Sequence, residues 1–130
     1  MFKAKNQSEV RMKVIIAGSR TIQDFNVVKK AIEESKFEIK EVISGGARGV
    51  DTLAIRWAKE NKIPYKVFPA DWEKYGRSAG AIRNRQMAKR ADAVIAIWNR
   101  LSKGTGDMIK VANVKGLHLF VFVLDDDARK

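Results

Sequence analysis

The sequence predicts an α/β domain in which helices cover both faces of a five-stranded parallel sheet. Short apolar runs alternate with segments of helical periodicity, the apolar runs are nearly continuous, and glycine and arginine gather in the connections that follow them. Strands that are buried on both faces lose the polar alternation of an exposed sheet, and crossovers between parallel strands are right-handed. We therefore expect a Rossmann-like doubly wound three-layer sandwich with strand order 3-2-1-4-5.

Five strands and four helices are expected in strict alternation. The strands are expected over residues 12–18, 38–46, 63–70, 92–98 and 117–124. The helices are expected over residues 24–35, 48–61, 79–91 and 104–116. In the first two helices, apolar residues recur every three to four positions, as in a helix that buries one stripe. We assign these two stripes to the core; they contain Phe25, Val28, Ile32, Val50, Leu53, Ala54, Trp57 and Ala58.

One folded domain is expected over residues 12–124, because 130 residues with 45% hydrophobic content suffice for a single core. Residues 1–11 are polar and show no periodicity, so they predict a flexible N-terminal arm, and residues 125–130 predict a polar C-terminal tail. The sequence lacks an apolar run long enough to cross a bilayer and the apolar stretch of a signal peptide. A cytoplasmic protein without a membrane partner is therefore expected.

The types of side chain present exclude several kinds of site. The chain has no cysteine, which excludes disulfides, thiol catalysis and thiolate metal sites, and its single histidine, His118, excludes a histidine-rich metal site. We therefore expect neither a metal nor a cofactor. The chain has 26 Lys and Arg against 15 Asp and Glu, a net charge of +11. Such a surface attracts anions, so phosphates, nucleotides and nucleic acid are the partners to consider.

The connection over residues 44–51, which reads SGGARGVD, carries the strongest local signal. Glycines between a strand and a helix let backbone amides approach an anion, and the helix dipole attracts it. Arg48 could add a charge-assisted contact, and Asp51 could accept a hydrogen bond from a ribose hydroxyl. The same residues also suit a tight turn in which Asp51 favours the helix start. The spacing matches neither the P-loop nor the GxGxxG fingerprint. The glycines concerned are Gly45, Gly46 and Gly49.

Two further connections are candidates for the same rim of the sheet. Residues 18–20, Gly-Ser-Arg, follow the first strand beside the switch in strand order, and their small residues leave room for a ligand. Residues 102–106, SKGTG, precede a helix and supply amides and a hydroxyl. Each also has a simpler interpretation: a strand-end turn with a solvated arginine, and an ordinary capped helix start.

The segment between Lys74 and Ala91 concentrates positive charge, with six basic residues and no acid. Arg83 and Asn84, near the start of a helix, are the pair that we place in the pocket, whereas Arg85 and Lys89 point elsewhere on that helix. Trp72 precedes this segment and either stacks on a base or closes the core under its loop. The six basic residues are Lys74, Arg77, Arg83, Arg85, Lys89 and Arg90.

Four segments together resemble the YspA-like, cpYpsA-related branch of the SLOG superfamily, which also contains the DNA-processing protein A (Smf) Rossmann domain and the LOG phosphoribohydrolases. They are VIIAGSRTI, VISGGARGVDTLAIRWA, FPADWEKYGRSAGAIRNRQMA and SKGTGDMI, and they span roughly residues 12–124. The resemblance implies a Rossmann-like fold, a nucleotide-type ligand and a homodimer or higher homo-oligomer. Carried over by position, the ligand-binding residues are Gly18, Ser19, Arg20, Gly45, Gly46, Arg48, Gly49, Asp51, Arg83, Asn84, Gly104 and Thr105.

The chain departs from the catalytic pattern of the LOG enzymes. Those enzymes carry a PGGxGT motif followed by a glutamate, whereas residues 102–108 read SKGTGDM. Hydrolysis of an N-glycosidic bond needs a carboxylate near the anomeric carbon. The candidates for this role are Asp51, Asp71 and Asp107.

The leading hypothesis is a protein that senses or sequesters a phosphate-bearing nucleotide or nucleotide-derived signalling molecule. The resemblance adds a possible setting, because this branch is associated with conflicts between bacteria and phages. One alternative is a hydrolase of an N-glycosidic or phosphate bond in such a nucleotide. The other is single-stranded nucleic-acid binding, in which a basic strip through Arg77, Arg85 and Lys89 would continue from the pocket.

Overall fold

The computed structural model describes residues 10–124 and shows five parallel strands in the order β3-β2-β1-β4-β5, which confirms the expected topology. The strands are β1 (Arg11–Gly18), β2 (Glu38–Ser44), β3 (Tyr65–Val67), β4 (Ala93–Trp98) and β5 (His118–Val123). The long helices are α1 (Phe25–Ser35), α2 (Val50–Glu60), α4 (Ala79–Arg90) and α5 (Lys103–Lys115).

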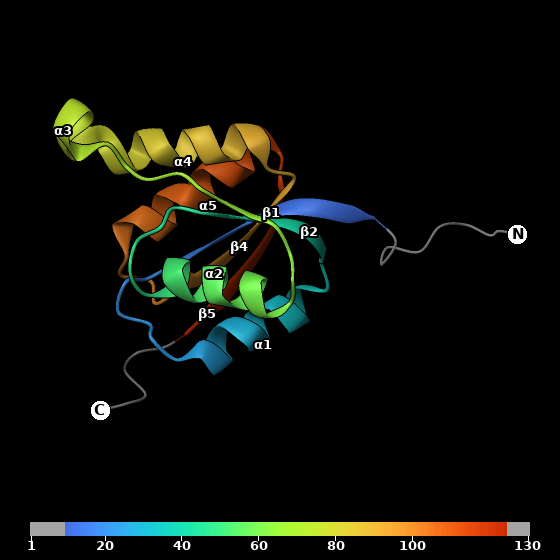
Figure 1. Ribbon diagram of the computed structural model, residues 1–130. Helices are drawn as coiled ribbons and strands as arrows, with labels where there is room; N and C mark the ends of the chain where they lie inside the picture. The colour runs from blue at the N-terminus through green and yellow to red at the C-terminus, as the bar shows by residue number, and fades with distance from the viewer. Residues whose placement is uncertain (1–9, 125–130) are drawn as a thin grey trace, which may run out of the picture.

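The helices form two layers, with α1 and α2 on one side of the sheet and α4 and α5 on the other (Figure 1). Central strand β1 alternates its side chains between two apolar cores. Val14 and Ile16 lie in the core that contains residues of α1 and α2, whereas Ile15 lies in the core that contains Met87 of α4 and Met108 of α5. This two-sided burial explains why the strand reads as a continuous apolar run.

Residues 71–78, which lie between the expected third strand and the expected third helix, contain a short helix α3 (Trp72–Tyr75) and a 3-10 turn η2 (Gly76–Ser78). The carboxylate of Asp71 accepts a hydrogen bond from the backbone N–H of Lys74 at 3.1 Å and caps the turn. In Figure 1 this segment projects beyond the sheet at the start of α4. The expected strict alternation is thus extended by one short helical segment.

Strand β3 is three residues long, shorter than the expected strand over 63–70. It pairs with β2 only at Val42, Ile43 and Ser44, because β2 itself ends at Ser44. At the start of β1, Arg11 pairs with Glu38 of β2, so β1 starts one residue before the predicted domain boundary. The rest of the proposed arm, residues 1–9, and the proposed tail, 125–130, lie outside the described residues.

Within residues 10–124, no helix combines the length and apolar character that a membrane span requires.

Candidate ligand-binding site

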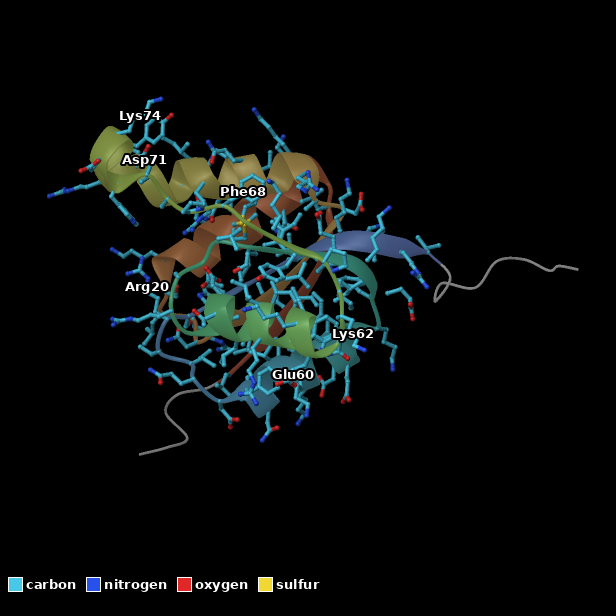
Figure 2. The ribbon with its side chains drawn as sticks, in the orientation of Figure 1. Arg20, Glu60, Lys62, Phe68, Asp71 and Lys74 are labelled. Carbon is cyan, nitrogen blue, oxygen red and sulfur yellow. The ribbon has the colours of Figure 1, made fainter. Side chains whose placement is uncertain are left out.

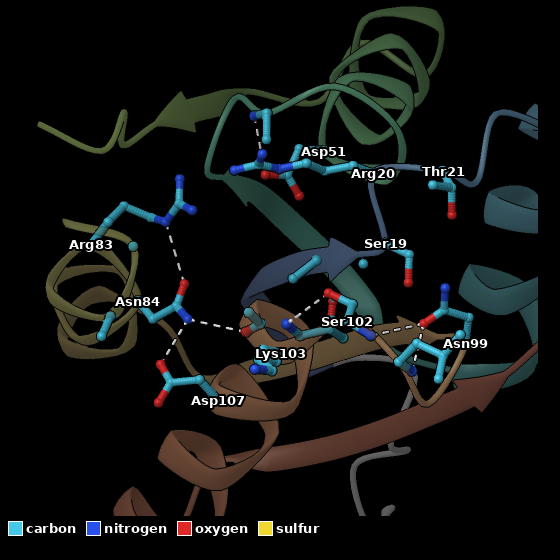
Figure 3. A pocket seen from close by; sticks show the side chains of 18 of the residues that line it. Ser19, Arg20, Thr21, Asp51, Arg83, Asn84, Asn99, Ser102, Lys103 and Asp107 are labelled. Carbon is cyan, nitrogen blue, oxygen red and sulfur yellow. Dashed lines mark hydrogen bonds between the residues drawn. The ribbon is translucent and has the colours of Figure 1, made fainter. Parts of the chain in front are cut away.

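A cavity of about 750 Å³ opens at the carboxyl ends of β1 and β4. In an open parallel sheet this is where the strand order reverses and where ligands bind. Its walls come from the connection after β1, the start of α2, α4 and the connection from β4 to α5 (Figure 3), together with Trp72 of α3. The cavity is lined by ten of the residues named from the sequence: Gly18, Ser19, Arg20, Asp51, Trp72, Arg83, Asn84, Gly104, Thr105 and Asp107.

Five residues named from the sequence do not line this cavity: Gly45, Gly46, Arg48, Gly49 and Asp71. Arg48 is exposed on the connection between β2 and α2. Asp71 caps α3 and borders a smaller cavity of about 180 Å³. Figure 2 shows Asp71 and Lys74 together at the outer tip of α3, away from Arg20. Of the three carboxylates considered for catalysis, two therefore share the main cavity.

The glycine-rich connection between β2 and α2 uses two of its backbone amides internally. The N–H of Gly46 donates to the Ser44 hydroxyl at 3.1 Å, and the N–H of Ala47 donates to Asp51 Oδ2 at 3.2 Å. The Ser44 hydroxyl in turn donates to the carbonyl of Asp51 at 3.0 Å. A carboxylate of the protein thus occupies the position at which an amide cradle would hold an anion.

The glycines of this connection allow close packing. A Cβ atom on Gly45 would lie 2.3 Å from Arg83 Nη1, and one on Gly49 would lie 2.5 Å from the carbonyl oxygen of Arg20. Gly49 also has φ of 81° and ψ of −134°, a backbone conformation that is open essentially to glycine alone. These two glycines bring the connections after β1 and β2 together beneath Arg83.

Arg83 joins α4 to the ends of two strands. Its Nη1 donates to the carbonyl of Gly45 at 2.8 Å and to that of Phe68 at 3.4 Å, while Nε donates to Asn84 Oδ1 at 3.3 Å. Burial lowers the pKa of Arg83, and the carboxylate of Asp51 counteracts this effect. Arg83 therefore shapes the cavity wall with part of its hydrogen-bonding capacity already used.

Asn84 continues this network into α5. Its Nδ2 donates to Asp107 Oδ2 at 2.9 Å and to the carbonyl of Gly104 at 3.3 Å. Arg85 also donates to Asp107 Oδ2, at 3.3 Å. The amide is 5% exposed, so its contacts set the position of the first turn of α5 relative to α4.

Asp51 is a buried carboxylate on the cavity wall, with 7% of its surface exposed. Burial raises its pKa to about 6, and the hydrogen bond from Ala47 and the charges of Arg83 and Arg20 only partly oppose the rise. Figure 3 places Asp51 beside Arg20, with Asp107 on the other side of the cavity beside Asn84. An acid with such a pKa exchanges its proton near neutral pH.

Ser19 is the one buried side-chain group in residues 10–124 that has no hydrogen-bond partner. It is 1% exposed and lines the cavity. Native proteins satisfy nearly all buried polar groups, so the unpaired hydroxyl of a residue that lines a cavity points to a ligand or water that completes it.

In the connection between β4 and α5, the sequence predicted residues 102–106 but not Asn99 or Leu101. Asn99 Oδ1 accepts from the N–H groups of Leu101 and Ser102 at 2.8 and 3.0 Å, and Ser102 then caps α5 by accepting from the N–H of Thr105. Asn99, Leu101, Ser102 and Lys103 all line the cavity. The capped helix start at Ser102 is one of the two interpretations given from the sequence, and Asn99 directly after a buried strand was the signal for the turn that precedes it.

Comparisons with known proteins agree with this architecture. Residues 12–75 match the model of the YspA, cpYpsA-related SLOG family. The Gene 61 protein of Mycobacterium phage D29 is 32% identical over 119 residues, which cover 85% of this chain and 95% of the phage protein. The chain belongs to this SLOG family. The family match covers β1 to α3 and includes the connections after the first two strands.

Two solved structures share the fold of this SLOG family member. DNA processing protein A of Streptococcus pneumoniae has a TM-score of 0.68 at 21% identity, covering 84% of this chain and 49% of that chain. DNA processing protein A of Helicobacter pylori, whose structure concerns its single-stranded DNA binding mode, has a TM-score of 0.56 at 20% identity, covering 88% of this chain and 66% of that one. This chain therefore spans about half of the first protein and under two thirds of the second.

Proposed function

We propose that the cavity binds a phosphate-bearing nucleotide or a nucleotide-derived signalling molecule. The observation that carries this proposal is the unpaired, buried hydroxyl of Ser19 on the wall of a cationic cavity. Leaving a buried hydroxyl without a partner costs about 1 to 3 kcal/mol, which a hydrogen bond to a bound ligand recovers. Sensing and sequestering need no further chemistry than this binding.

The charges around the cavity favour an anion. Four basic residues line it, Arg20, Arg77, Arg83 and Lys103, against two acids, Asp51 and Asp107. Asp107 already accepts hydrogen bonds from Asn84 and Arg85. The cationic side chains therefore outnumber the carboxylates that face the ligand.

The start of α5 is the best position for the phosphate. The N–H groups of Lys103 and Gly104 belong to the first turn, in which no intrahelical acceptor exists, and the helix dipole adds positive potential there. Both residues line the cavity, and Lys103 carries its own charge. The connection between β2 and α2, whose amides at Gly46 and Ala47 already have acceptors, then serves as support.

Trp72 supplies a surface for the base. Its side chain is 52% exposed and lines the cavity, so it does not close the core. An exposed indole beside a cationic cavity suits stacking on a planar base. A cavity of about 750 Å³ lies within the roughly 300 to 1,000 Å³ typical of small-molecule sites.

The test is a calorimetric titration with inorganic phosphate and with nucleoside mono-, di- and triphosphates. Lys103→Met is expected to weaken nucleotide binding by roughly 1.5 to 3 kcal/mol, because it removes a charge-assisted contact. Lys110→Met is the matched control, since Lys110 is exposed on the same helix and does not line the cavity. If no nucleotide binds the wild-type chain, or if both variants lose affinity equally, the proposal is wrong.

Single-stranded nucleic acid is a second candidate ligand. It is favoured by the shared fold with DNA processing protein A of H. pylori and by the exposed basic residues Arg85 and Lys89 on α4. A titration with a fluorescent oligonucleotide at several salt concentrations tests it. If the chain binds single strands, Lys89→Met and Arg77→Met should each lower the slope of log affinity against log salt concentration by about one, the share of one phosphate contact. Binding of mononucleotides alone, with no effect of Lys89, would exclude it.

Hydrolysis is a third candidate, favoured by the two carboxylates that share the cavity, Asp51 and Asp107. Asp51, with a pKa of about 6, could act as a general acid or base near neutral pH. Mass spectrometry of a nucleotide incubated with the chain would reveal a free base or a released phosphate. Turnover that persists in Asp51→Asn and Asp107→Asn would show that neither carboxylate is responsible.

A further inference from the structure

The two edges of the sheet differ in the atoms that they leave unpaired. Strands β3 and β5 are its edge strands. In β5, the N–H groups of His118 and Leu124 donate toward β4, so the intervening odd-numbered residues Leu119, Val121 and Val123 turn their N–H and C=O groups outward. In β3, the backbone N–H and C=O groups of Tyr65 and Val67 face outward by the same alternation, because the backbone of Pro64 and Phe68 bonds to β2.

The β3 edge is protected against pairing. The strand has three residues and carries Lys66 at its centre. A short strand and a lysine are usual means by which edge strands avoid pairing with another chain.

The β5 edge has none of these features. It is six residues long, pairs with β4 in unbroken register and reads HLFVFV. The side chains of Leu119, Phe120, Val121 and Phe122 are partly exposed, and Val123 is 40% exposed. Within the described residues, no hydrogen bond reaches the outward groups of Leu119, Val121 or Val123 from elsewhere in the chain. An apolar edge of this length is a template for strand addition.

The charge distribution indicates what occupies this edge. With a net charge of +11, two copies of the chain repel each other over most of their surface. Residues 116–128, which include β5, are the longest stretch without Lys or Arg, and three aspartates follow Leu124 in the sequence. The edge strand thus belongs to the part of the chain that a second copy can approach with the least repulsion.

We propose that β5 pairs with β5 of a second copy in antiparallel orientation about a two-fold axis, so that two five-stranded sheets become one. Such an interface is self-complementary, since a strand without charged side chains meets itself, and each outward N–H and C=O of β5 gains a partner. It lies at the opposite end of the strand order from the protected β3 edge.

The test compares two variants by sedimentation velocity in moderate salt. The wild-type chain is expected at twice its 14.7 kDa mass. Val123→Lys is expected to raise the dimer dissociation constant at least about tenfold, because the two-fold axis introduces the charge twice. Tyr65→Lys is the matched control: Tyr65 is also 40% exposed and faces outward, but from the β3 edge. The control is expected to remain dimeric.

Hydrogen exchange of the wild-type chain gives a second readout that does not depend on a variant folding. The amides of Leu119, Val121 and Val123 are expected to exchange slowly at high protein concentration and faster on dilution. A wild-type chain that stays at 14.7 kDa at all concentrations overturns the proposal. So does a dimer that Tyr65→Lys breaks as readily as Val123→Lys. Protection that is independent of concentration would mean that a segment of the same chain covers the edge, which also overturns it.

Discussion

The connections from β2 to α2 and from β4 to α5 both carry glycines at the start of a helix, yet they differ in how many of their residues line the cavity. In the first, Ala47 and Asp51 bond to each other and only these two residues reach the cavity. In the second, residues 101–105 all line the cavity. Glycines in a connection therefore indicate that another group comes close to the backbone. Only the contacts show whether that group is a ligand or another part of the protein.

On the proposed function, the same difference separates a connection that stabilises the fold from one that binds the ligand. The first connection holds α2 against the end of β1, through a hydrogen bond from the N–H of Val50 to the carbonyl of Ser19. In the second, the N–H groups of Lys103 and Gly104 have no acceptor within the helix, and both residues line the cavity. Substitutions in the two connections should consequently affect different measurements.

The largest effect is expected from Gly49→Ala. The added Cβ would lie 2.5 Å from the carbonyl of Arg20 in a backbone conformation that alanine avoids, so the free energy of unfolding should fall by about 2 to 4 kcal/mol. Urea unfolding measures this loss. The control is Gly104→Ala, where no atom lies within 4 Å of the new Cβ.

Gly104→Ala is expected to keep the stability within about 1 kcal/mol of the wild type, because alanine suits the first turn of a helix. It places a methyl group on the cavity wall and should weaken nucleotide binding instead. Equal losses of stability in the two variants would contradict the division between a supporting and a ligand-facing connection.

Asp51→Asn is expected to have the next largest effect, and its sign depends on pH. The pKa of Asp51 rises from 3.8 to about 6 on folding, so the wild-type chain loses stability as the pH increases from about 4 to above 6. The amide keeps an acceptor for the N–H of Ala47 and has no charge to bury. At pH 7 the free energy of unfolding of the variant should therefore exceed that of the wild type by at most roughly 2 to 3 kcal/mol.

Urea unfolding of both chains between pH 3.5 and 8 tests this prediction. The difference between them should vanish below about pH 4, where Asp51 is protonated in the folded and the unfolded state alike. A variant that is less stable than the wild type at pH 7 would show that the ionised carboxylate supports the connection between β2 and α2.

The smallest effect is expected from Arg48→Ala. Arg48 was named from the sequence as a phosphate contact, but it is exposed and does not line the cavity. Its removal should change nucleotide affinity by about 0.5 kcal/mol or less, as is usual for surface substitutions. Calorimetry beside Lys103→Met checks this. A loss of 1.5 kcal/mol or more would restore the first connection as a ligand contact.

The fold was predictable from the sequence because its signals are local and repeated. Continuous apolar runs such as Val94 to Ile97, helical stripes such as Val50 and Ala54, and the alternation between them predict a doubly wound sheet. The short helix within residues 71–78 was not predicted, because it has only four residues after its cap at Asp71, too few to show a helical period.

The sequence by itself determined the strand order, the rim that carries the cavity and ten of the 21 residues that line it. Only the tertiary structure decided which polar groups have partners. Asp51 accepts a hydrogen bond from the N–H of Ala47, and Arg83 donates to the carbonyls of Gly45 and Phe68. The hydroxyl of Ser19 has no partner. The bond between Ala47 and Asp51 is local and agrees with the tight turn that the sequence also allowed. The bonds of Arg83 reach residues 38 and 15 positions away, and no spacing along the chain encodes them, because they depend on the final packing of the connections.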